Sequence, residues 1–411
     1  MPIARSRDRV TISSEKQVRT AGRFDLAVVG AGIVGLATAL AGARRGMRVL
    51  VVDADTQANG ASVRNFGLIS VTGQERGAMW QRARRSREVW REVAAAAGIE
   101  VVHSGLWMLV RRAESVQVLE AFLDTEMAEG CRLLSASEAR ERWPTLRAAP
   151  LEAVLESTIE LRVESRTAIP RLAEWLAKAH GISFLRNTRV LDIAVPGVRT
   201  SRGDLQAERV AVCPGDDFNG LYAERLASYG LTRCKLQMLR LASPGFALPA
   251  ALMSDLGLGR YAGYAALPAA EPLKARLTRE QPEHLRHGIH LIVVQSADGS
   301  LVVGDSHHYA PTPDPFGSDA VDALILEEFR TALGIEPPAV LERWVGTYAS
   351  AQDRLVLFDA PDPRVRIAVV THGAGASTGF AIGEEVISSL LDRGTATGSD
   401  RVFGQCLRGR P

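Results

Sequence analysis

Three glycines and one aspartate are spaced to bind a dinucleotide. Gly30, Gly32 and Gly35 stand in GxGxxG register within VVGAGIVGLATA, and Asp53 follows 18 residues after the third glycine. The first glycine permits a tight turn, the second removes the Cβ that would block a pyrophosphate, and the third lets helix and strand pack closely. A carboxylate at Asp53 accepts a hydrogen bond from a ribose 2′-OH and repels a 2′-phosphate, which disfavours NADP.

A second glycine-rich turn stands about 340 residues later in the chain. Gly373, Gly375 and Gly379 lie in VVTHGAGASTG, between an apolar run and a helical pattern. A helix that begins there would point its N-terminal N–H groups at a second part of the same ligand, such as a flavin ring. The turn therefore favours FAD over NAD, although glycines that only shape a turn would give the same pattern.

The elements that hold both turns follow from the apolar pattern. The run at 24–29 predicts a buried parallel strand, 33–43 a helix of small residues, and 47–55 a second strand. Strand, helix and strand in this order form a right-handed βαβ unit. The run at 208–215 predicts a strand that returns to this sheet, and 366–391 predicts a further strand, turn and helix.

The remaining segments predict a second, more strand-rich unit. Residues 289–305 hold two apolar runs joined through Asp298–Gly299, which predicts a hairpin. A strand pair is expected at His103–Arg111. Helices are expected near 74–97, 115–129 and 321–334, and from Arg166 onwards.

We therefore predict an α/β fold with a discontinuous, Rossmann-like FAD-binding domain and an α+β substrate domain whose sheet is mostly antiparallel. Residues 1–23 are Arg-rich and lack an apolar stretch, and we expect them to form a mobile lead-in. The expected domain boundaries are 24–80, 151–220 and 344–411 for the FAD-binding domain, and 81–150 and 221–343 for the substrate domain.

Composition excludes several other classes of protein. The 411 residues carry a net charge of +2, with 46% hydrophobic and 23% charged residues, which disfavours a nucleic-acid or membrane-surface partner. No 18 uninterrupted apolar residues predict a membrane span. Cys131, Cys213, Cys234 and Cys406 form no CxxC pair, so neither a metal site nor a disulfide framework is expected. Reduced thiols in a cytoplasmic enzyme are the simplest interpretation.

Taken together, these motifs resemble the D-amino-acid oxidase superfamily, which includes the glycine and sarcosine oxidases, from Phe24 to Leu391. Four stretches are similar, more narrowly, to the flavoprotein subfamily associated with phosphonate catabolism: GASVRNFGLISVTGQ (60–74), VQSADGSLVVGDSHHY (294–309), ERWVGTY (342–348) and THGAGASTGFAIGEE (371–385). Those relatives are proposed to oxidise aminophosphonates, including N-methylated 2-aminoethylphosphonate, to an aldehyde. The chain departs from their usual pattern at Ile69–Ser70, His308 and Ala376–Ser377, all of which concern the pocket.

The resemblance implies a reaction whose difficult step belongs to the flavin. A hydride moves from the carbon beside nitrogen to flavin N5, and hydrolysis of the imine gives an aldehyde or keto product. The protein orients the C–H bond and holds a neutral amine, so no Ser-His-Asp or paired-carboxylate signature is required. Sarcosine-oxidase relatives attach the flavin through a cysteine before the last strand, but 347–361 contains none, so the FAD is expected to be non-covalent.

The resemblance also implies where FAD binds. The segment SVRNFG (62–67) follows the ribose-binding strand and passes along the flavin in relatives. The residues expected to contact FAD are Gly30, Gly32, Ile33, Val34, Gly35, Asp53, Ala54, Ser62, Arg64, Asn65, Phe66, Gly67, Val190, Gly215, Gly373, Gly375, Ser377, Thr378 and Gly379.

Four side chains are expected to serve the reaction. Arg64 is placed at the flavin or its phosphates, with a surface ion pair as the alternative. Of the adjacent His307 and His308, an extended backbone points only one into the pocket, and we favour His307 over a loop histidine bonded to backbone. His372 is expected near flavin N1–C2=O and Tyr348 in the pocket wall, although a turn histidine and a core aromatic would look the same.

Three functions stay open at this level. The preferred one is an FAD-dependent aminophosphonate or N-methyl amine oxidase. The second is a glycine, sarcosine or D-amino-acid oxidase or dehydrogenase that acts on a carboxylate, and the third is a non-catalytic flavin-binding subunit. The expected partners are a small-molecule amine and oxygen or another electron acceptor, with no nucleic acid.

Overall fold

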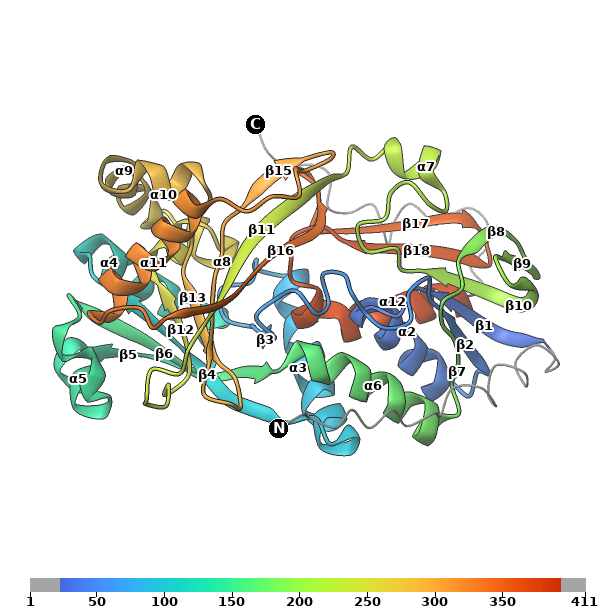
Figure 1. Cartoon of the computed structure of the whole chain (residues 1–411), viewed down its shortest axis with the longest axis horizontal. Coiled ribbons are helices and arrows are strands. Elements are labelled where there is room, and N and C mark those ends of the chain that lie inside the picture. The colour runs from blue at the N-terminus through green and yellow to red at the C-terminus, as the bar shows by residue number, and fades with distance from the viewer. Residues whose placement is uncertain (1–22, 393–411) are drawn as a thin grey trace, which may run out of the picture.

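The computed structural model describes residues 23–392, in which two sheets lie side by side with helices packed around them (Figure 1). The expected lead-in, apart from Arg23, and the segment that contains Cys406 lie outside the described residues. Within residues 23–392, no helix is long and apolar enough to cross a membrane.

Sheet A contains β1 (Phe24–Val29), β2 (Val49–Val52), β7 (Ser183–Leu185), β8 (Val190–Ala194), β9 (Gly197–Thr200), β10 (Gly203–Val212), β17 (Val356–Asp362) and β18 (Val365–Val370). Strand β1 pairs in parallel with β2 and β10, and β10 pairs in parallel with β18. The predicted return of the chain to this sheet, through β10 and then β18, is therefore confirmed. Strands β1 and β2, in the parallel part of the sheet, are nearly all apolar because both faces of a parallel sheet are covered.

Sheet B contains β3 (Leu68–Ile69), β4 (Val101–Val110), β5 (Cys131–Ser135), β6 (Ala153–Val163), β11 (Thr232–Leu241), β12 (Ala251–Ser254), β13 (Ile292–Gln295), β14 (Leu301–Gly304), β15 (His308–Ala310) and β16 (Val340–Ser350). Its pairs are antiparallel except for β12 with β4, which confirms the predicted fold class. The predicted hairpin of β13 and β14 is also confirmed. The predicted strand pair at His103–Arg111 is wrong, because this segment is one strand, β4, whose partners β6 and β12 come later in the chain.

The larger helices are α2 (Ile33–Arg44), α3 (Ala78–Ala97), α4 (Ala113–Leu123), α6 (Ser165–His180), α9 (Ala270–Glu280), α11 (Asp319–Leu333) and α12 (Gly375–Leu391). Helix α12 packs on α2, although the two are separated by most of the chain (Figure 1). A Cβ at Gly383 would lie 2.6 Å from the backbone of Ala37, so only glycine permits this approach. The contact brings the two glycine-rich turns to the same end of sheet A.

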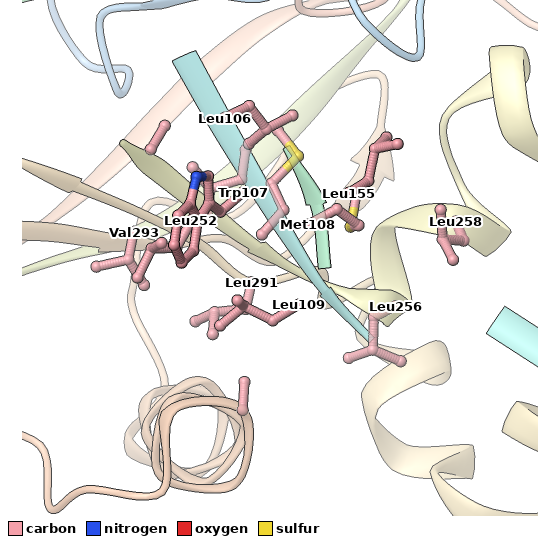
Figure 2. Close-up of a cluster of buried hydrophobic side chains, with 14 of the residues drawn as sticks. Leu106, Trp107, Met108, Leu109, Leu155, Leu252, Leu256, Leu258, Leu291 and Val293 are labelled. Atoms are coloured by element: carbon pink, nitrogen blue, oxygen red, sulfur yellow. The ribbon is translucent and has the colours of Figure 1, made fainter. Parts of the chain in front are cut away.

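A hydrophobic core supports sheet B beside the loops that carry the candidate site. Figure 2 shows side chains from β4, β6, β12 and β13 gathered with those of a 3-10 helix, η3 (Asp255–Gly259). Burying each large apolar side chain stabilises the fold by about 1.5–3 kcal/mol. The labelled members are Leu106, Trp107, Met108, Leu109, Leu155, Leu252, Leu256, Leu258, Leu291 and Val293.

A buried ion pair fixes the start of η3. The carboxylate of Asp255, which has no solvent exposure, accepts hydrogen bonds from Arg112 Nη1 at 2.8 Å and Ser115 Oγ at 3.0 Å. An unpaired charge at this depth would be very unfavourable, so the pair holds η3 against α4. The chain segment that directly follows η3 therefore starts from a fixed position.

Candidate functional site

The first glycine turn has the close packing that its motif predicts. Gly30 adopts a φ of +100°, and a Cβ there would lie 2.4 Å from the carbonyl oxygen of Cys213. A Cβ at Gly35 would lie 1.9 Å from the carbonyl oxygen of Gly30. At the end of β2, Asp53 accepts hydrogen bonds from the N–H of Ala31 at 2.5 Å and of Asp55 at 2.8 Å. The carboxylate is thus held beside the turn.

The second glycine turn faces the same space. Gly373 has a φ of +80° and lies against Tyr348, where a Cβ would be 3.1 Å from Cζ of the ring. Helix α12 then begins at Gly375, opposite Ile33 of α2, and neither helix has a side-chain cap from its own N-cap residue. Helix N-termini carry N–H groups with partial positive charge, so the two turns can bind anionic or carbonyl oxygens from two sides.

A cavity of about 470 Å³ lies between these turns and sheet B. The sequence-predicted residues that line it are Gly32, Ile33, Val34, Gly35, Ser62, Arg64, Asn65, Phe66, Gly67, Gly215, His307, Tyr348, His372, Gly373, Gly375 and Ser377. Those that do not line it are Gly30, Asp53, Ala54, Val190, Thr378 and Gly379. Of these, Gly30 and Asp53 shape the first turn, whereas Val190 is buried where β8 begins.

The segment 62–67 forms part of the wall through its own hydrogen bonds. Ser62 Oγ accepts from the N–H of Ile33 at 2.9 Å, in place of a helix cap. The guanidinium of Arg64 donates to Val345 O at 3.3 Å and to Asn59 Oδ1 at 3.2 Å, rather than to an acid. Asn65 accepts from Gly67 N–H at 2.7 Å and Ser165 Oγ at 2.8 Å, so its side chain shapes the loop.

His372 lies in the wall as a neutral imidazole. Burial lowers its pKa to about 4, and its Nδ1 lies 2.8 Å from the carbonyl oxygen of Leu355. A proton on Nδ1 satisfies that carbonyl and leaves Nε2 as a hydrogen-bond acceptor. To stabilise a negative charge on a bound flavin, Nε2 would have to carry a second proton, and burial of the ring disfavours that protonation.

A cation that was not predicted from the sequence also lines this cavity. Arg260 directly follows η3, lines the cavity, and donates from Nη2 to the phenol oxygen of Tyr309 at 2.9 Å. Arg260 belongs to no recognisable motif, and only the pairing of β12 with β4 and β13 brings it to the site. Its planar guanidinium is suited to bind a carboxylate or phosphonate.

Two histidines and an aspartate form a buried cluster next to Arg260. His290 Nδ1 lies 3.3 Å from Asp305 Oδ1, and His307 Nε2 lies 3.8 Å from Asp305 Oδ2. Burial raises the pKa of Asp305 to about 8 and lowers those of His290 and His307 well below their usual value. His308 points elsewhere and contacts His287, so of the adjacent pair only His307 lines the cavity. Of these three residues, only His307 was predicted from the sequence to line the pocket.

The residues present fit FAD. At both glycine turns, neighbouring atoms come so close that a Cβ would obstruct them. The N-termini of α2 and α12 line one cavity. The carboxylate of Asp53 lies beside the first turn. The turn at Gly32 and Gly35 would hold the pyrophosphate, with Asp53 at the ribose, and the turn at Gly373–Gly375 would hold the flavin.

Comparison with known proteins agrees with this fold. Residues 25–388 match the family model described as FAD dependent oxidoreductase. Over 201 residues the chain is 28% identical to monomeric sarcosine oxidase from Bacillus sp. (strain B-0618), a match that covers 47% of this chain and 51% of that protein. The chain thus spans about half the length of this curated relative.

Solved structures are similar over most of the chain. Glycine oxidase from Bacillus cereus ATCC 14579 is 17% identical with a TM-score of 0.71, over 89% of this chain and 94% of that one. L-proline dehydrogenase from P. horikoshii is 18% identical with a TM-score of 0.71, over 92% of this chain and 96% of that one. At these identities the likeness shows the fold.

Proposed function

Because this chain belongs to the FAD dependent oxidoreductase family, we propose that it oxidises the C–N bond of a small amine that carries an acid group. The observation that carries this proposal is Arg260, a guanidinium that lines the same cavity as both glycine turns. A cation there can hold the acid group of a substrate while the amine end points toward the flavin site.

Bound FAD would supply the electron-pair acceptor for this oxidation. The protein's own side chains would position the substrate. Arg260 and the phenol of Tyr309, already joined by a hydrogen bond, would bind the acid oxygens. Tyr348, which packs against Gly373, would form the wall between the acid-binding end and the flavin site.

We further propose that the acid group is a phosphonate, as in 2-aminoethylphosphonate or its N-methyl form. The four stretches that resemble the phosphonate-associated subfamily are far apart in sequence, yet each contributes residues to the wall of this one cavity. Examples are Ser70, Tyr309, Thr347 and Ala376, one from each stretch.

A carboxylate substrate is the second candidate, and the match to monomeric sarcosine oxidase favours it. This alternative keeps the same fold and the same orientation of the amine. Only the group that Arg260 binds changes, because a guanidinium donates hydrogen bonds to carboxylate and phosphonate oxygens in similar geometry. A non-catalytic flavin-binding subunit is the third candidate, and it predicts no turnover by the isolated chain.

The three candidates separate in one experiment. The purified yellow protein is mixed anaerobically with 2-aminoethylphosphonate, its N-methyl form, sarcosine, glycine or D-alanine, and the flavin absorbance is followed. Bleaching by the phosphonates alone supports the full proposal. Bleaching by sarcosine, glycine or D-alanine alone discards the phosphonate, and no bleaching with any amine contradicts the proposed oxidation.

Variants of Arg260 test the side chain on which the proposal rests. Loss of a charge-assisted hydrogen bond in Arg260→Gln should cost about 1.5–3 kcal/mol of substrate binding, which is a roughly 10- to 150-fold rise in substrate Kd. Arg260→Lys keeps the charge and should recover part of the loss. Arg330→Gln is the matched control, because Arg330 is half exposed and pairs with the exposed Glu336. Unchanged substrate affinity in Arg260→Gln would contradict the assignment.

A further inference from the structure

The His290, Asp305 and His307 cluster has the chemistry of a metal site, although nothing in the local sequence suggests one. Each residue offers one ligand atom, and the three atoms lie within 4.8 Å of one another. The residues are only 3%, 4% and 7% exposed. We propose that these three side chains bind a divalent metal ion, Zn²⁺ in the first instance, at the wall of the cavity.

The distances suit a shared ion better than a direct hydrogen bond. Tetrahedral zinc binds nitrogen and oxygen at about 2.0–2.2 Å, which places neighbouring ligand atoms roughly 3.3–3.6 Å apart. Asp305 Oδ1 lies 3.3 Å from His290 Nδ1, which matches this spacing, and Asp305 Oδ2 lies 3.8 Å from His307 Nε2, which is slightly wider and would close by a small side-chain movement. Two histidines and one carboxylate are also a common set of three protein ligands around zinc.

Two of the atoms that face the centre have no other partner. His290 Nδ1 and Asp305 Oδ1 are buried without a hydrogen bond. A buried polar atom left unpaired costs about 1–3 kcal/mol, and more if it is charged. A cation between them removes this cost for both atoms at once.

The far side of each imidazole is fixed in the way that metal ligands usually are. His307 Nδ1 lies 2.8 Å from the carbonyl oxygen of Gly288, which accepts a hydrogen bond from a proton on Nδ1 and so leaves the lone pair of Nε2 toward Asp305. His290 Nε2 lies 3.1 Å from the hydroxyl of Tyr261, which leaves Nδ1 toward the same centre. Gly288 has a φ of +60° and lies directly against His307, where a Cβ would meet its Cβ at 2.8 Å.

An ion at this position would have an open side, because all three ligands also line the cavity. Its remaining position would hold water or an anionic oxygen ligand. The competing occupant is a single proton shared between Asp305 and a histidine, which would satisfy the same atoms without a metal. Metal content distinguishes the two, whatever the substrate of the enzyme proves to be.

The test is metal analysis of the FAD-loaded protein, made without a polyhistidine tag and grown with added zinc. About one zinc per chain is expected after gel filtration, with saturable rebinding after removal by a chelator. Asp305→Asn and His290→Gln should lower the zinc content at least tenfold while FAD content stays at the wild-type level. His308→Gln is the matched control, because His308 contacts His287 outside the cluster, and it should keep its zinc.

Two results overturn the proposal directly, and loss of FAD from the variants calls for a second measurement. A wild-type protein without zinc that also takes up none at micromolar Zn²⁺ holds a proton at this centre. Zinc that is lost in His308→Gln and kept in Asp305→Asn is bound adventitiously at the histidine pair. If the variants lose FAD as well, zinc X-ray absorption of the wild type decides: two imidazoles with oxygen support the site, and any other ligand set overturns it.

Discussion

Replacing Gly35 with alanine should weaken both the fold and the binding of FAD. The added Cβ would lie 1.9 Å from the carbonyl oxygen of Gly30 and 2.9 Å from its carbonyl carbon. Both atoms belong to the backbone, so no change of rotamer relieves the clash. The turn and α2 have to separate by about 1 Å before the contact becomes tolerable.

The expected magnitudes follow from that displacement. Overpacking of this kind typically lowers the free energy of unfolding by about 1–3 kcal/mol. The same movement draws the N–H groups of the turn away from the phosphates. Losing one hydrogen bond to a charged group costs about 1.5–3 kcal/mol, which raises the Kd for FAD roughly 10- to 150-fold.

The assay is titration of FAD into the apoprotein, followed by quenching of flavin fluorescence, with urea unfolding of the apoprotein measured in parallel. Gly60→Ala is the control, because a Cβ there would meet no atom within 4 Å. The reasoning is refuted if Gly35→Ala binds FAD as tightly as Gly60→Ala and the wild type do.

Three further predictions concern stability and the cofactor. Burial lowers the pKa of His103 to about 4, so the folded state resists its protonation. The stabilising contribution of neutral His103 is complete above the unfolded pKa of about 6.5 and is lost as pH falls toward 4. Urea unfolding across this range should therefore show a steeper loss of stability in the wild type than in His103→Gln. Asp255→Ala leaves buried donors of Arg112 and Ser115 without their acceptor, although Arg112 keeps Glu280, and should lower the free energy of unfolding by about 1–3 kcal/mol in urea. Glu336→Ala, in an exposed pair, should change it by less than about 1 kcal/mol. Acid precipitation should release all flavin absorbance into the supernatant, and yellow colour in the pellet would contradict non-covalent binding.

Features specified by neighbouring residues were predictable from the sequence. The strand, turn and helix around Gly30–Gly35 follow from local spacing, and the hairpin of β13 and β14 follows from its Asp298–Gly299 turn. Features that depend on distant pairing were not. The prediction for His103–Arg111 failed because a ten-residue apolar strand does not reveal whether its partner is adjacent or, as with β6, about 50 residues later.

The candidate site shows the same contrast between residues in local motifs and residues that distant strand pairing brings together. The glycine-turn residues that line the cavity carry a motif, whereas Arg260 and His290 stand in loops with no periodicity or fixed spacing. Only the side-by-side packing of β12, β13 and β14 brings them together with Asp305. His307 was found because it follows a strand in a recognisable stretch, but its partners in the cluster were not.

The packing of α12 on α2 has a consequence for how the protein is made. Helix α2 leaves the ribosome long before α12, with an apolar surface that includes Ile33 and Ala37, both buried against α12 in the finished fold. The helix that covers it is not translated until Leu391, so a growing chain exposes this surface through most of its synthesis. An apolar surface that stays exposed during synthesis favours aggregation, so the packing of α12 on α2 protects the protein only once the chain has been made as far as Leu391.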